Sequence, residues 1–172
     1  MNKTIVAVAT LLILAVVNWA IWGKEQHLAE GEVVYLELAP VDPRSLMQGD
    51  YMALNFEIGN HIRQALRERK PDDNEMEVAN GQVIVSLDER RVAHFERLGA
   101  EEENLADSER RLRYRLRAGR VKFATDAFFF QEGHAERYEP AGYGRFRVNE
   151  KGEPLLVALY DDELERLGEV ER

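Results

Sequence analysis

The sequence predicts a mainly β (α+β) protein, in which an N-terminal transmembrane helix precedes an antiparallel β-rich sandwich or open barrel with small helical additions. Residues 4–22 contain no charged side chain and are rich in Leu, Ile, Val and Ala. After residue 32, short segments alternate apolar and polar side chains with the period of two that half-buried strands show. Glycine and proline turns separate these segments, as expected between strands.

The length of the chain and its net charge limit the class of protein that it can be. The chain has 172 residues, enough for one domain and an appendage. The net charge is −9, and all 32 acidic residues follow residue 23. An acidic domain is poorly suited to nucleic acid or to an anionic membrane surface, since both bind largely through Lys and Arg. The chain lacks cysteine, which excludes disulfides, thiolate metal sites and thiol nucleophiles.

The first element expected is a helix over residues 4–22, roughly 28 Å long and close to the hydrocarbon thickness of a bilayer. Trp19 and Trp22 stand where an interfacial aromatic belt would lie, and Lys3 precedes the run. The positive-inside rule then places the N-terminus in the cytoplasm. A cleaved secretory signal is the alternative, but bulky residues near the end of the run leave no small-x-small cleavage site.

The anchor prediction divides the chain into three parts. Residues 1–23 are the transmembrane anchor, residues 24–32 a linker, and residues 33–172 an extracytoplasmic β-rich domain. Within this domain a first strand is expected over residues 33–39 and ends at Pro40, because proline has no donor for a sheet ladder.

Residues 40–50 form a turn-rich stretch that carries most of the candidate site residues. Pro43 and Gly49 favour tight turns, and neighbouring carboxylates cap such turns. The candidates for a binding site or a structural turn are Asp42, Arg44, Gly49, Asp50 and Tyr51, with Glu132 at a later Glu-Gly turn. The residue types favour capping, with Arg44 paired to one of the aspartates; a small site for a carboxylate or phosphate is the functional alternative.

Residues 51–58 predict a second strand with one apolar face, and Gly59 is expected to end it. A short helix should follow over residues 60–69, with Asn60 as its N-cap. Its inward side chains should be Ile62, Ala65 and Leu66.

The remaining elements are short strands. A hairpin is expected over residues 82–87 and 92–98, followed by a strand at 111–117, a tight turn at 118–119 and a return strand at 121–125. Residues 127–130 are apolar, residues 134–143 suggest an interrupted helix, and residues 144–148 and 155–160 predict a final hairpin.

Residues 49–56, Gly-Asp-Tyr-Met-Ala-Leu-Asn-Phe, resemble the motif of the GDYXXLXY family, with Phe56 in place of the last tyrosine. Residues 40–46, 129–133 and 145–159 are also similar to the family, so the resemblance spans most of residues 33–160. It implies a bacterial protein with an N-terminal membrane anchor and no established biochemical activity. Members are often encoded beside, or fused to, multi-spanning membrane proteins.

Three other features have competing interpretations. Arg111, Arg113, Arg115 and Arg117 share one strand face, which could bind a polyanion but is more typical of a solvated face laddered against Glu on neighbouring strands. Ser45 and Lys122 could form a signal-peptidase-like serine–lysine pair. However, Ser45 follows Pro43, whereas the serine of those peptidases precedes the corresponding proline. The histidines have no metal-site spacing, and no cofactor motif is present, so neither metal nor cofactor is expected.

The function predicted from the sequence is a non-catalytic binding or accessory module in the bacterial inner membrane, with its domain in the periplasm. Its expected partners are the lipid bilayer, through residues 4–22, and a polytopic inner-membrane protein; no nucleic acid is expected. A membrane-bound serine peptidase and a small-ligand binder are the alternatives.

Overall fold

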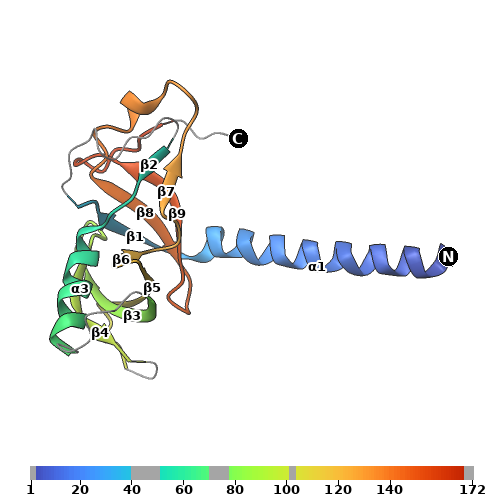
Figure 1. Ribbon diagram of the computed structural model, residues 1–172, viewed down its shortest axis with the longest axis horizontal. Helices are drawn as coiled ribbons and strands as arrows, with labels where there is room; N and C mark the ends of the chain where they lie inside the picture. Colours follow the sequence, from blue (N-terminus) through green and yellow to red (C-terminus); the bar gives the residue numbers. More distant parts are fainter. Residues whose placement is uncertain (1–2, 40–50, 70–77, 101–103, 169–172) are drawn as a thin grey trace.

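The computed structural model describes residues 3–39, 51–69, 78–100 and 104–168. A single long helix, α1 (Lys3–Glu30), projects from a β-rich domain (Figure 1). It is long and apolar enough to cross a bilayer, and none of its residues is buried against the domain. A core helix of a soluble protein would be mostly buried, so this arrangement fits a membrane anchor. Residues 24–30, expected in a linker, continue the same helix.

The described strands of the domain form three antiparallel sheets. The first has the order β1-β8-β9, from β1 (Glu32–Glu37), β8 (Tyr143–Val148) and β9 (Pro154–Tyr160). The second pairs β2 (Tyr51–Ala53) with β7 (Ala127–Phe129). The third has the order β4-β3-β5-β6, from β3 (Val78–Leu87), β4 (Ala93–Gly99), β5 (Glu109–Arg117) and β6 (Arg120–Lys122). The antiparallel β-rich class is confirmed, and the sheets do not close into a barrel.

The helix α3 (Glu57–Arg69) lies against the four-stranded sheet, and a 3-10 turn, η1 (Ala135–Arg137), follows β7 (Figure 1). Ile62 on α3 is fully buried, and Ala65 and Leu66 pack against the core, as predicted. The interrupted helix expected over residues 134–143 is limited to η1. The return strand after β5 ends at Lys122, because the chain turns at Ala124 with φ of 56°.

The predicted strand at residues 51–58 is too long, since β2 ends at Ala53 and α3 begins at Glu57. Glu57 places its carboxylate in the first helical turn, where the helix dipole favours it, and accepts a hydrogen bond from Asn60 Nδ2 at 2.8 Å. Asn60 is therefore inside the helix and is not its N-cap. Gly59 does not end a strand; it lies where Val121 packs closely, with Val121 Cβ 3.3 Å from the position of an added β-carbon.

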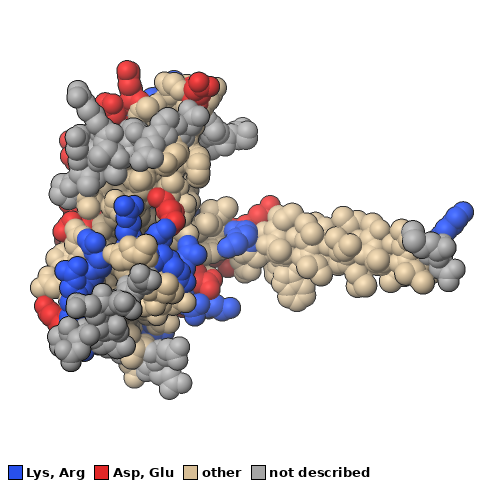
Figure 2. Space-filling model, in the orientation of Figure 1, with Lys and Arg blue, Asp and Glu red and all other residues tan. Residues whose placement is uncertain are grey.

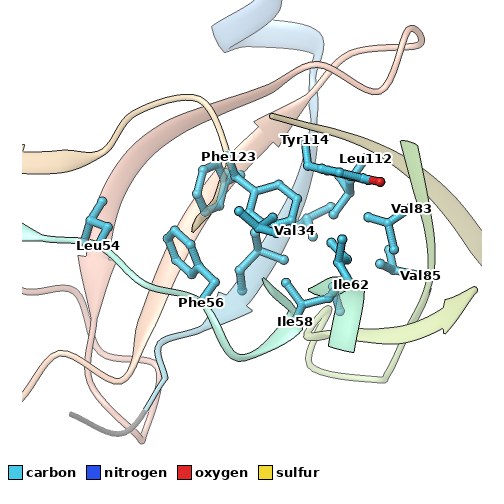
Figure 3. Packing of buried hydrophobic residues seen from close by; sticks show 14 of the residues in the cluster. Val34, Leu54, Phe56, Ile58, Ile62, Val83, Val85, Leu112, Tyr114 and Phe123 are labelled. Atoms are coloured by element: carbon cyan, nitrogen blue, oxygen red, sulfur yellow. The ribbon is translucent and has the colours of Figure 1, made fainter. Parts of the chain in front are cut away.

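One hydrophobic core joins the sheets and α3 (Figure 3). Phe56 is central, since its ring makes edge contacts with Phe146 at 5.3 Å and with Phe123 at 6.1 Å between centroids. Phe146 comes from the three-stranded sheet and Phe123 follows β6, so this aromatic cluster links the two larger sheets. Burial of such side chains is the main source of stability.

Gly144 on β8 lies directly against this cluster, which generates a prediction. A β-carbon there would lie 2.9 Å from Phe56 Cε1 and 3.2 Å from Phe146 Cε2. We therefore expect Gly144→Ala to lower stability by about 1–3 kcal/mol through overpacking. Thermal unfolding of the full-length protein in detergent measures the change. Gly23→Ala, where an added β-carbon meets nothing within 4 Å, is the matched control and should leave the melt of the domain unchanged. Equal melting temperatures for both variants would contradict the packing account.

Candidate functional site at the base of the anchor

Of the six candidate residues, the structure describes Tyr51 and Glu132. Asp42, Arg44, Gly49 and Asp50 lie outside the described residues, as does Ser45. Lys122, the possible base for Ser45, forms an ion pair with Asp126. Glu132 is exposed in the turn after β7. The site formed by the candidate residues therefore stays a prediction.

Tyr51 begins β2 directly opposite Phe129 of β7, with the two ring centroids 5.8 Å apart. The Phe129 side chain is 74% exposed. The next motif positions point inward, since Leu54 and Phe56 are both buried. The second half of the motif is therefore core packing, and its first described residue, Tyr51, is partly buried in an aromatic pair with Phe129.

The clearest polar arrangement is one that the sequence did not indicate, at the junction of α1 with the domain. Gly31 N donates to His27 O at 3.0 Å at the end of the helix. His27 Nε2 donates to Arg147 O at 3.0 Å, and Arg147 Nη1 donates to Gly31 O at 2.7 Å. A β-carbon on Gly31 would lie 2.5 Å from His27 O, so the close approach requires glycine. These three residues, the anchor joint, hold α1 against β8.

An ion-pair cluster extends the joint to the four-stranded sheet. The Glu32 carboxylate accepts from Arg110 Nε and Arg110 Nη2, and Arg91 Nη1 lies 3.4 Å from Glu32 Oε1. The hydrogen bonds that Arg110 donates to Glu32 raise the pKa of the Arg110 guanidinium, which keeps its charge in any case. Because Glu32 follows Gly31, this cluster connects both larger sheets to the point where the anchor leaves.

A cleft of about 530 Å³ lies beside the joint, between the end of α1 and the tip of the β8–β9 hairpin. Side chains of both charges line it, among them Gln26, His27, Glu30, Arg110, Arg111 and Lys151. Such a lining can hold a polar or charged group by hydrogen bonds. Among the described residues, no group of three or more His, Asp or Glu side chains could hold a metal ion.

The hairpin tip that borders the cleft is fixed by Asn149. Its Oδ1 accepts from Lys151 N at 3.0 Å and Glu153 N at 2.9 Å, and its Nδ2 donates to Glu153 Oε2 at 2.9 Å. The hydrogen bond from Asn149, with the nearby charges of Arg113 and Lys151, holds the pKa of Glu153 below its ordinary value of 4.5. Glu153 also pairs with Arg113 at 3.2 Å, which ties the tip to β5.

An apolar helix of membrane-spanning length, joined by hydrogen bonds to an antiparallel β-rich domain, fits a single-pass membrane-anchored protein. The sequence profile of the family described as GDYXXLXY protein matches residues 13–159, and the chain belongs to this family. No match was found among curated proteins or among solved structures.

The anchor joint generates a prediction about rigidity. Gly31→Val places side-chain atoms against the His27 carbonyl and Arg147, so the joint must open. We expect a broader distribution of distances between the anchor and the domain. Two spin labels on introduced cysteines, one at Trp22 and one at Glu89, measure this by pulsed electron resonance in a chain that has no other cysteine.

Gly133→Val is the control for the joint, because Gly133 adopts φ of +80° and lies in an open turn between β7 and η1. It should strain that turn and leave the distance distribution narrow. An equally narrow distribution for Gly31→Val would show that the joint does not fix the domain.

The lowered pKa of Glu153 predicts a pH effect. A depressed folded-state pKa stabilises the fold above the unfolded pKa, and this contribution is lost as pH falls through the folded value. Stability should therefore decline below about pH 4.5, with Asp88 and Glu109 contributing because their pKa values are also lowered. Glu153→Gln should make the decline shallower in melts recorded from pH 7 to pH 3. Parallel curves for the two proteins would rule out this role for Glu153.

Proposed function

We propose that this protein is a non-catalytic accessory module that holds its β-rich domain on the periplasmic face of the bacterial inner membrane and binds a multi-spanning membrane protein. The observation that carries the proposal is the anchor joint. A flexible tether would suffice to keep a domain near the membrane, whereas hydrogen bonds from His27 and Arg147 join the anchor to the domain and should restrict the angle between them. A fixed angle serves a protein that must present one face to a neighbour in the same membrane.

The surface of the anchor supports a helical partner. Every described apolar side chain in α1 is exposed, so the helix can pack against other transmembrane helices as well as lipid. Asn18 lies within the apolar run, and its Nδ2 donates to Leu14 O at 2.8 Å. Its Oδ1 can accept a hydrogen bond from a neighbouring helix, a contact that stabilises helix association in membranes.

The charge at the N-terminal end of α1 favours one orientation of the protein in the membrane. Lys3 favours a cytoplasmic N-terminus, so the domain should face the periplasm. A phosphatase fused at the C-terminus should be active, and a reporter that works only in the cytoplasm should be silent when fused there. The reverse pattern would overturn the periplasmic assignment.

The role of Asn18 is tested by capture of the partner. We expect Asn18→Leu to reduce at least several-fold the amount of multi-spanning protein that co-purifies from cross-linked, detergent-solubilised membranes, because one interhelical hydrogen bond is lost. Val16→Leu lies on the opposite side of the helix and is the control. Undiminished capture by Asn18→Leu, with capture lost in Val16→Leu, would place the contact on the other face of the anchor.

A further inference from the structure

One face of the four-stranded sheet is strongly basic although the chain as a whole is acidic. The inner face of β5 is buried through Leu112, Tyr114 and Leu116. The outer face carries the side chains that alternate with these and the ones paired with them on β6. We define this basic face as Arg113, Arg115, Arg117, Arg120 and Lys122.

The strand register places like charges opposite one another. Arg115 pairs with Lys122 and Arg117 pairs with Arg120 across β5 and β6. On the other side of β5, the residues opposite Arg113, Arg115 and Arg117 on β3 are uncharged. The expected ladder of Glu on neighbouring strands is therefore wrong. Like charges directly opposite each other destabilise a sheet, and here both pairs occur side by side.

Few described carboxylates offset this charge. Glu153 pairs with Arg113, and Asp126 pairs with Lys122. Arg115 donates to Ala124 O at 2.8 Å, and Arg117 donates to Ala79 O at 3.2 Å and to Asn80 Oδ1 at 3.0 Å, all neutral acceptors. The face thus keeps a net positive charge. In Figure 2 the Lys and Arg side chains gather over the half of the domain where Figure 1 draws α3, β5 and β6, and carboxylates are prominent at the other end.

The basic face is turned toward the side from which the anchor leaves. Arg111 alternates with the same set on β5, and it lines the cleft together with Gln26 and His27 of α1. The opposite face of the sheet is covered by α3, which lies on the far side of the domain from the anchor (Figure 1). The anchor joint holds this arrangement in place.

The length of the helix sets the distance to the bilayer. The apolar run ends at Trp22, and α1 continues to Glu30, a rise of roughly 12 Å. The headgroup region occupies roughly 5–8 Å of that distance. Arg and Lys carry their charge at the end of a long stem, and electrostatic attraction extends over a Debye length of roughly 10 Å. Arg111, which lines the cleft beside the end of α1, is therefore within reach of lipid phosphates, and the basic face continues from it along β5.

We propose that the basic face binds the anionic phospholipid headgroups of the membrane in which α1 is embedded. This inference rests on membrane insertion of α1 and does not require the proposed partner protein. The net acidity of the rest of the domain repels the same surface, so the attraction selects one orientation. Lipid phosphate would also relieve the repulsion between the paired basic side chains.

The experiment uses the full-length protein in nanodiscs of phosphatidylcholine, with or without about a third of phosphatidylglycerol. A fluorophore on Val78→Cys reports on the basic face, because Val78 is opposite Arg117 and 68% exposed. Lipids with a paramagnetic headgroup quench it when the face approaches the bilayer. We expect strong quenching in anionic nanodiscs that falls as salt is raised, and weak quenching in neutral ones.

Three variants separate the effect of charge from an effect on the fold. Arg113→Gln with Arg115→Gln and Arg117→Gln should reduce the docking equilibrium on the order of a hundred-fold at low salt, since each basic residue near an anionic surface contributes roughly five-fold. The same three positions changed to Lys should retain docking. Arg67→Gln with Arg69→Gln and Arg137→Gln alters the net charge equally on exposed residues outside the basic face and should retain docking too.

Three outcomes would overturn the proposal. Equal quenching in neutral and anionic nanodiscs would show that lipid charge is not recognised. Retained docking in the triple Gln variant would remove the basic face from the interaction. Cross-links from position 78 to a protein in native membranes, together with weak quenching in anionic nanodiscs, would assign the face to an acidic protein partner instead.

Discussion

The arrangement of this molecule depends on the anchor joint. Gly31, His27 and Arg147 connect the end of α1 to β8 through backbone and side-chain hydrogen bonds. Because β8 is the central strand of β1-β8-β9, the joint attaches the helix to the middle of the sheet as well as to β1, which follows it in the chain. The Glu32 cluster then extends the connection to β5 through Arg110. We infer that this connection sets which face of the domain lies toward the membrane.

The residues around the family motif pack between the sheets and connect them into one domain. Leu54 and Phe56 continue from β2 into the core, and Phe56 contacts aromatic rings from both larger sheets. The close approach of Phe56 to Gly144 leaves no room for a side chain on that part of β8. The motif is thus explained, for its described positions, by packing; Phe56 fills a buried site without needing the hydroxyl that tyrosine would bring.

Much of the fold could be predicted from local pattern, and the exceptions have physical reasons. The alternation of apolar and polar residues predicted β1, β5 and the β3–β4 and β8–β9 hairpins. The apolar run predicted α1. The end of β2 was missed because Phe56 and Ile58 are buried with a spacing of two although a helix begins between them. The spacing of two arises because both side chains point into the core on either side of the start of α3. It does not indicate an extended backbone there.

The polar junction and the basic face could not be predicted in the same way. His27 and Arg147 lie far apart in the sequence, and neither has a motif around it. The row of arginines on β5 could be recognised in the sequence. Whether neighbouring strands neutralise it depended on the strand register, which places Lys122 and Arg120 opposite these arginines. The net negative charge predicted instead that the domain is poorly suited to an anionic membrane surface, because a sum over the chain does not show how charges are distributed over a surface.

We infer that the anchor joint holds the domain in one orientation, close to the bilayer. Neutron reflectometry of the full-length protein in a supported bilayer measures this most directly, because it gives the thickness and distance of the protein layer. The structure predicts a dense layer in contact with the headgroups, with the profile of a single orientation. A diffuse layer, separated from the headgroups by solvent, would contradict the claim.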